Sequence, residues 1–128
     1  MPLATVYSRA KLGINAPLVT VEVHLSGGLP TFNIVGLRIT VNLAPADLPK
    51  EGGRFDLPIA IGILLASGQV PAAPLKDLEL IGELGLSGEL RAVDAALPAA
   101  IHANAAGHIL ILPAANSGLA SIVDDTGL

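Results

Sequence analysis

The chain has 128 residues, of which 52% are apolar, 2% aromatic and 14% charged. This length fits one domain with an aliphatic core, and the 14 glycines and 10 prolines exclude a long-helix or coiled-coil protein. The formal net charge of −4, with seven scattered Lys and Arg residues, argues against a nucleic-acid surface on this domain, and the lack of cysteine excludes thiolate chemistry.

No segment of the sequence predicts a membrane-spanning helix or a signal peptide. The uncharged run 57–75 is interrupted by three prolines and two glycines, which leaves it short of the ~20 apolar residues that a span needs. The first residues lack a basic segment followed by an apolar one. We expect a cytoplasmic domain without membrane contact, whose apolar excess indicates a surface covered by partners.

Alternation of apolar and polar residues predicts three strands in the first part of the chain. In 19–25 the odd-numbered residues are all apolar and share one face, which is typical of a half-buried strand. Residues 5–9 form a shorter partner, and the alternating run 38–43 forms a third strand. Gly36 and Leu37 then fit a two-residue hairpin turn.

A loop over 44–53, rich in turn-forming residues, precedes the first predicted helix at 57–66. Asp56 is placed to cap the helix, and Pro58 is tolerated in a first helical turn. Because this segment is apolar nearly all round, we expect a helix buried on most sides.

A hairpin and a second helix are predicted next. Residues 78–84 and 89–93 read as the two strands of the hairpin. Asp94 is placed to cap a helix over 95–106, which Gly107 ends.

The last predicted elements are a buried strand over 108–112 and a final helical turn capped by Asn116 or Ser117. Strands therefore come in runs with two or three helices between them. This order predicts an α+β fold.

The loop leading into the first helix carries the candidate site, which consists of Lys50, Gly52, Gly53, Arg54 and Asp56. Free backbone N–H groups and the dipole at a helix N-terminus favour an anion, and Lys50 and Arg54 add positive charge. We therefore expect an anion site or a partner contact here. The alternative is that the glycines only permit a tight turn and that Asp56 only caps the helix.

No residue pattern indicates a catalytic or metal centre. The dipeptide Gly-Lys is absent, so the chain has no P-loop and should not hydrolyse ATP alone. His24, His102 and His108 share no metal-ligand spacing with acidic residues. We assign no catalytic residue, metal ligand or cofactor to this domain.

The stretch V-N-L-A-P-A-D-L-P-K-E-G-G-R-F-D-L-P-I-A over 41–60 resembles the N-terminal domain of the magnesium-chelatase-like AAA+ ATPases of the ComM/YifB competence family. Residues 16–24 and 34–37 match the family's opening, and 82–84 and 88–91 match its later part. The resemblance covers nearly the whole chain. It implies a domain like the proteolytic domain of Lon, with the ribosomal protein S5 domain 2-like fold of a mixed sheet and two to three helices.

In the family, a charged helical segment separates a V-G-L motif, similar to residues 35–37 here, from a strand similar to residues 38–43. In this chain the motif and the strand follow each other directly. We interpret this as a lost segment. Residues 1–128 would then be a single Lon-like N-terminal domain of a larger ATPase, with a helical segment missing between residues 37 and 38. The alternative is a true deletion closed by a hairpin.

Peptidase chemistry of the Lon type is expected to be lost. Alignment with the similar Lon loop places Arg54 where the nucleophilic serine would sit and Leu97 near the position of the lysine. Arginine is neither a nucleophile nor a base, and leucine has no proton to exchange. Ser67 and Ser87 have no Lys or His beside them in the sequence.

The resemblance implies a non-catalytic assembly or regulatory domain of a ComM-type ATPase. Bacterial members resemble hexameric helicases that promote branch migration of DNA in natural transformation. The expected partners are the chain's own ATPase domain and the other subunits of a homo-hexamer, with ATP and magnesium bound by the ATPase and DNA contacted through it. Two alternatives are a Lon-like serine peptidase with a relocated nucleophile, Ser67 or Ser87, and a stand-alone anion-binding module that uses the Gly52–Gly53 loop.

Overall fold

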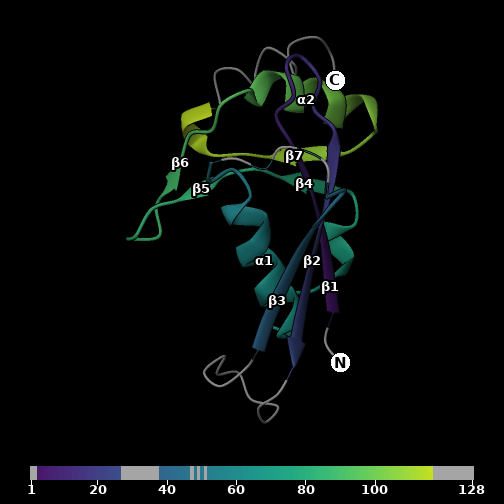
Figure 1. Cartoon of the computed structure of the whole chain (residues 1–128), viewed down its shortest axis with the longest axis vertical. Helices are drawn as coiled ribbons and strands as arrows, with labels where there is room; N and C mark the ends of the chain where they lie inside the picture. Colours follow the sequence, from purple (N-terminus) through teal and green to yellow (C-terminus); the bar gives the residue numbers. More distant parts are fainter. Residues whose placement is uncertain (1–2, 27–37, 47, 49, 51, 117–128) are drawn as a thin grey trace.

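The computed structural model describes residues 3–26, 38–46, 48, 50 and 52–116, and in this part of the chain it shows an α+β fold (Figure 1). A mixed five-stranded sheet has the strand order β3-β2-β1-β4-β7. Its strands are β1 (Leu3–Arg9), β2 (Leu18–Ser26), β3 (Arg38–Ala44), β4 (Leu78–Leu80) and β7 (Ile109–Ile111). The first three are antiparallel neighbours, and β4 and β7 run parallel to β1. The predicted α+β class is confirmed.

The antiparallel half of the sheet forms as its sequence pattern predicts. In β2 the alternating apolar side chains are almost completely buried, and the polar ones between them are half-buried. Val21 pairs with Val6 of β1 and with Leu43 of β3, so apolar side chains of the three strands share one face. Helix α1 (Asp56–Ala66) packs on β1 and β2 from this face, and Gly62 provides the close approach to Val23.

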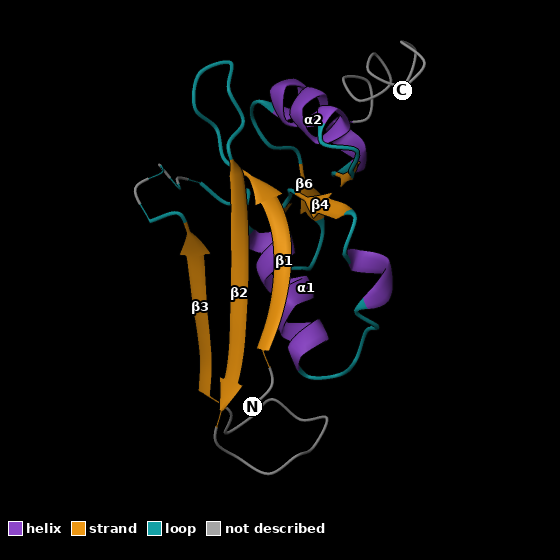
Figure 2. Ribbon diagram, turned by 90° about the vertical axis from the view of Figure 1, so that its right-hand side faces the viewer, coloured by secondary structure: helices purple, strands orange, loops and turns teal. Residues whose placement is uncertain are grey.

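Helix α2 (Ala96–Ala105) packs on the other face of the sheet, against β7. The two faces are visible at β4, because its residues Leu78 and Leu80 join the core under α1, while Ile81, the residue after the strand, joins Ala96 and Ala99 under α2. Figure 2 shows α1 behind β1 and β2, with α2 at the far end of β1. The described part of the chain therefore has two separate cores, one on each face of the sheet.

The predicted hairpin is only partly correct. Its first arm is split into β4, which belongs to the main sheet, and β5 (Glu83–Leu84), which pairs with β6 (Leu90–Arg91) in a separate hairpin. The split occurs because Gly82 leaves the sheet to contact the α1 region, donating its N–H to the carbonyl of Arg54 and accepting from the N–H of Leu57.

Three other expectations need correction. Neither predicted helix cap forms: Phe55 and Ala95 occupy the cap positions of α1 and α2, without side-chain cap bonds. The strand predicted at 108–112 is not buried, because β7 lies at the edge of the sheet, where Ile109 is 62% exposed. The predicted turn at Gly36–Leu37 and the cap at Ser117 lie outside the described residues.

Two short 3-10 helices complete the described elements, η1 (Ala73–Leu75) and η2 (Ala114–Asn116). In η2, Asn116 is buried and its side-chain amide bonds both the N–H and the carbonyl of Val93. This contact anchors the strand-to-helix connection that lines the candidate site. None of the helices in the described ranges is long and apolar enough to cross a membrane.

Candidate functional site

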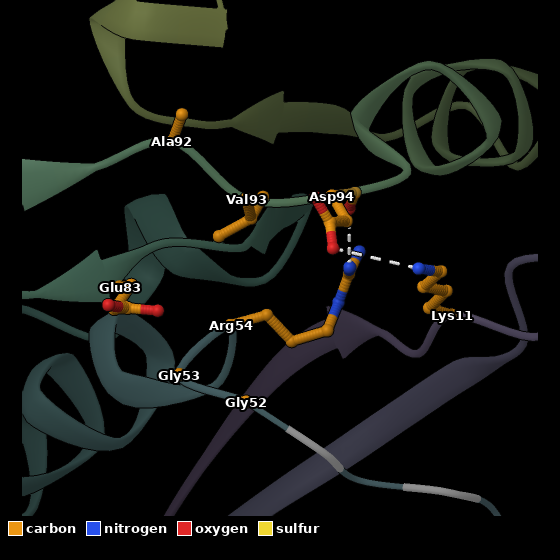
Figure 3. A pocket seen from close by; sticks show the side chains of 8 residues that line it. All are labelled: Lys11, Gly52, Gly53, Arg54, Glu83, Ala92, Val93 and Asp94. Atoms are coloured by element: carbon orange, nitrogen blue, oxygen red, sulfur yellow. Dashed lines mark hydrogen bonds and ion pairs between the residues drawn. The ribbon is translucent and has the colours of Figure 1, made fainter.

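A pocket of about 390 Å³ lies between the residues after β1, the loop before α1 and the segment between β6 and α2 (Figure 3). Its lining residues are Lys11, Gly52, Gly53, Arg54, Glu83, Ala92, Val93 and Asp94. Three of the five predicted site residues, Gly52, Gly53 and Arg54, are therefore brought together here.

Arg54 extends across this pocket and ties two distant segments together (Figure 3). Its Nε donates to the carbonyl oxygen of Arg9 at 2.9 Å, and its Nη1 donates to the carbonyl oxygen of Asp94 at 2.6 Å. The residue is only 5% exposed. Arg54 thus joins the end of β1 to the residues that precede α2.

The third nitrogen of the guanidinium has no hydrogen-bond partner among the residues that the structure describes. Arg54 Nη2 is buried and makes no hydrogen bond to any described residue. Burial lowers the pKa of Arg54 from its usual value, because desolvation disfavours the charged form, and the negative charge of Asp94 opposes this shift. A buried cationic donor without an acceptor is costly, so this nitrogen is the most unusual group in the site.

The two glycines of the loop serve its backbone conformation and its packing. Gly52 has a φ of +71°, in the left-handed region that favours glycine. A Cβ on Gly53 would lie 2.5 Å from Cγ of Glu83, so a larger residue here would force the Glu83 side chain to move.

The other two predicted site residues, Lys50 and Asp56, do not line the pocket. Lys50 Nζ donates to the carbonyl oxygens of Pro45 and Leu48 and so closes its own loop. Asp56 Oδ2 accepts a hydrogen bond from the N–H of Leu84 at 3.1 Å, which fixes β5 to the start of α1. Both side chains serve local structure.

The expected set of free amides at the start of α1 is wrong. The N–H of Asp56 donates to the carbonyl of Gly53, and the N–H of Leu57 donates to the carbonyl of Gly82, each at 3.0 Å. Pro58 has no N–H to offer. Residues 56–58 of α1 therefore leave no free N–H group for an anion.

Sequence analysis missed three charged residues of the pocket, Lys11, Glu83 and Asp94. Lys11 Nζ and Asp94 Oδ2 form an ion pair of 3.6 Å, and the two side chains are 56% and 87% exposed. Glu83 lies 3.8 Å from Nη1 of Arg91 across the β5–β6 hairpin. No local pattern marks these residues, because only the packing of four distant segments brings them together.

None of the described residues that line the pocket offers a hydroxyl or thiol nucleophile. Arg54, which stands where the Lon-like alignment put a serine, lines this pocket, whereas Leu97, near the position of the lysine, lies in α2 and is not among the lining residues. The relocated-nucleophile alternative gains no support from the serines: Ser67 Oγ donates to the carbonyl of Leu64 at the end of α1, and Ser87 lies in the turn between β5 and β6.

A second group of charged residues lies under α2, where Glu79 is completely buried. Its carboxylate accepts from Nε and Nη2 of Arg9 at 2.6 and 2.9 Å, and its Oε2 lies 2.7 Å from Nδ1 of His108. Every oxygen of Glu79 has a partner, so this cluster is structural. Within the described residues, no group of three or more His, Asp or Glu side chains is arranged to hold a metal ion.

Comparison with known proteins identifies the family. The sequence model described as "Subunit ChlI of Mg-chelatase" matches residues 37–116. The chain is 50% identical to "Competence protein ComM" of Haemophilus influenzae and 43% identical to the uncharacterized protein YifB of Salmonella typhimurium and of Escherichia coli. The chain therefore belongs to the Mg-chelatase-like family of subunit ChlI and is of its ComM/YifB type.

These alignments include 98–99% of the chain but only 30% of each relative, so the chain spans about a third of the length of the curated relatives it matches. The alignment with the Haemophilus protein extends over 151 positions, more than the 128 residues present here. The relatives therefore contain positions within the matched region that have no counterpart in this chain.

Proposed function

We propose that this chain is the non-catalytic N-terminal domain of a ComM-type AAA+ ATPase and that it serves the assembly or regulation of that ATPase. The observation that carries the proposal is the alignment of 98% of the chain with only 30% of a competence protein at 50% identity. The parent protein would be cytoplasmic and homo-hexameric, and would process DNA by branch migration in natural transformation. ATP and magnesium would be bound outside residues 1–128, since this chain has no P-loop.

We also assign the domain to the ribosomal protein S5 domain 2-like fold, with a helical segment missing between residues 37 and 38. The mixed sheet and the two described helices are compatible with this fold. In the antiparallel pair of β2 and β3, Ser26 lies opposite Arg38. A longer connection between these adjacent ends would leave the strand register unchanged, because loop length costs little once the ends meet. The extra positions in the relatives' alignments support such a segment.

Two features support a role without catalysis. The position at which the Lon-like alignment expects the nucleophilic serine holds Arg54, whose guanidinium is bonded to two backbone carbonyls. Large apolar side chains are exposed on several elements, including Ile14, Leu86 and Ile109. Such side chains suit a domain that packs against other domains or subunits.

The test compares the parent ATPase with a variant that lacks residues 1–128. We expect the truncated protein to keep the site for ATP but to lose hexamer assembly or the stimulation of hydrolysis by DNA, measured by light scattering and by phosphate release. Unchanged assembly and unchanged stimulation would contradict the proposed role. The intact mass of the natural gene product, compared with 12.9 kDa for this chain, shows whether an ATPase is attached.

The peptidase alternative has its own test. Incubation of the domain with fluorescent casein should give no cleavage. Cleavage that disappears in Ser67→Ala or Ser87→Ala would overturn the non-catalytic assignment, and cleavage that persists in both would indicate a contaminating protease.

A further inference from the structure

We propose that the pocket at Arg54 binds a small oxyanion, a carboxylate or a phosphate, on the Nη2 side of the guanidinium. The proposal is independent of the function of the parent protein. Its basis is that Arg54 is 5% exposed and lines the pocket, while its Nη2 has no hydrogen-bond partner among the described residues. Buried polar atoms in native proteins nearly always have partners, so an unpaired cationic donor beside a pocket indicates a missing acceptor.

The charges around the pocket identify the sign of the ligand. Glu83 pairs with Arg91, and Asp94 pairs with Lys11. Arg54 bonds only backbone carbonyls and forms no ion pair with a carboxylate of the described residues. Among the described residues that line the pocket, Arg54 is therefore the cation without a counter-charge. A buried charge without a counter-charge is unfavourable, and an anion would supply it.

Comparison with Arg9 strengthens this argument, because Arg9 is a second buried arginine that lies close by. Its guanidinium is paired with the carboxylate of Glu79, and its remaining nitrogen bonds the carbonyl of Ala16 at 2.9 Å. Of the two buried arginines in the described part of the chain, Arg9 has all its nitrogens satisfied, whereas Arg54 lines the pocket and has a buried nitrogen without a partner. Only the second is suited to a ligand.

The path to the guanidinium passes the Lys11–Asp94 pair, which Figure 3 shows beside Arg54 at one end of the pocket. Both side chains are largely exposed and 3.6 Å apart, so their pairing is weak. An incoming oxyanion would displace the Asp94 carboxylate and bind both Arg54 Nη2 and Lys11 Nζ. A carboxylate or a phosphate carries at least two oxygens, one for each of these two cationic donors, and this requirement defines the ligand class.

The experiment titrates the chain with inorganic phosphate and, separately, with acetate, at an ionic strength held constant with sodium chloride. Isothermal titration calorimetry measures the dissociation constant, and the melting temperature from circular dichroism provides an independent readout, since a ligand of the native state raises it. We expect saturable binding of at least one anion. The anion that binds more tightly distinguishes a phosphate source from a carboxylate source.

Two exposed residues allow variants that should fold normally. Asp94→Asn removes the competing carboxylate and should tighten binding by roughly two- to fivefold, whereas Lys11→Gln should weaken it by a similar factor, as expected for one exposed charge pair. Matched controls are Asp77→Asn and Lys76→Gln, which change the same charges on exposed residues outside the pocket. The controls should bind like the unmodified chain.

Arg54→Gln should abolish binding if the variant folds. If it does not fold, the affinities of Asp94→Asn and Lys11→Gln test the proposal. The proposal is overturned if neither anion binds saturably. It is also overturned if Asp94→Asn and Lys11→Gln bind with the same affinity as their controls, because the anion would then lie elsewhere on the surface.

Discussion

The buried carboxylate of Glu79 gives the sharpest test of how this domain is stabilised. Glu79→Met would leave the guanidinium of Arg9, only 8% exposed, without a counter-charge. Removal of one partner of a buried ion pair costs about 3–5 kcal/mol. Since small domains have about 5–15 kcal/mol of stability in total, this variant should be close to unfolding at ambient temperature. Arg9→Met should cost a similar amount, because Glu79 would then be the unpaired charge.

The double variant Arg9→Met/Glu79→Met separates an ionic effect from a packing effect. It removes both charges and fills the space with apolar side chains, a change that is often neutral for buried pairs. We expect it to be more stable than either single variant, with a coupling of about 3 kcal/mol or more. Urea unfolding followed by far-ultraviolet circular dichroism is the assay, because the chain has no Trp and one Tyr. Additive costs of the two single substitutions would refute the reasoning.

Two further substitutions test the packing of α1. A Cβ at Gly62 would lie 2.6 Å from Cγ2 of Val23, so Gly62→Ala should lower the free energy of unfolding by about 1–3 kcal/mol, although alanine favours helix. In a Val23→Ala background, Gly62→Ala should lower the free energy of unfolding by less. If urea unfolding shows that the losses of the two substitutions simply add, the close contact between Gly62 and Val23 is refuted. Asp56→Ala removes the acceptor of the Leu84 N–H and should cost about 1–3 kcal/mol, whereas Asp56→Asn should cost less. Equal losses in thermal melts of the two variants would show that this hydrogen bond contributes nothing.

The antiparallel half of the fold could be predicted from sequence because its signals are local. The apolar side chains of β2 alternate strictly, and the structure buries this face under α1. The helix itself follows from an apolar run between turn residues, and its observed start differs from the predicted one by a single residue. In both cases the pattern of one segment carries enough information to specify the element.

The errors arise where a distant segment decides the local conformation. Residues 78–84 look like one strand, yet Gly82 bonds the loop before α1 and ends the pairing. Asp94 precedes a helix, as a capping residue would, but its carbonyl is engaged by Arg54 and the next residue, Ala95, adopts a left-handed conformation with φ of 56°. An apolar strand such as β7 has the same sequence pattern at the edge of a sheet as in its centre.

In the candidate site, too, some residues could be predicted from local sequence and others could not. The loop glycines and Arg54 could be singled out because they lie directly before a predicted helix and because charged residues are few in this chain. Lys50 bonds carbonyls of its own loop, and Asp56 bonds the N–H of Leu84 in β5. The spacing of residues in the sequence does not predict these contacts. Lys11 and Asp94 were missed because they lie 83 positions apart in the chain and meet only after folding.

The placement of Arg54 has a consequence for how the domain opens. Its two cores lie on opposite faces of the sheet, an arrangement in which each layer could exchange its amide protons independently. Arg54 bonds the carbonyl at the end of β1 and the carbonyl just before α2, so α2 cannot detach without breaking a buried bond anchored beside α1. The amide protons of α1 and α2 should therefore exchange as one cooperative unit.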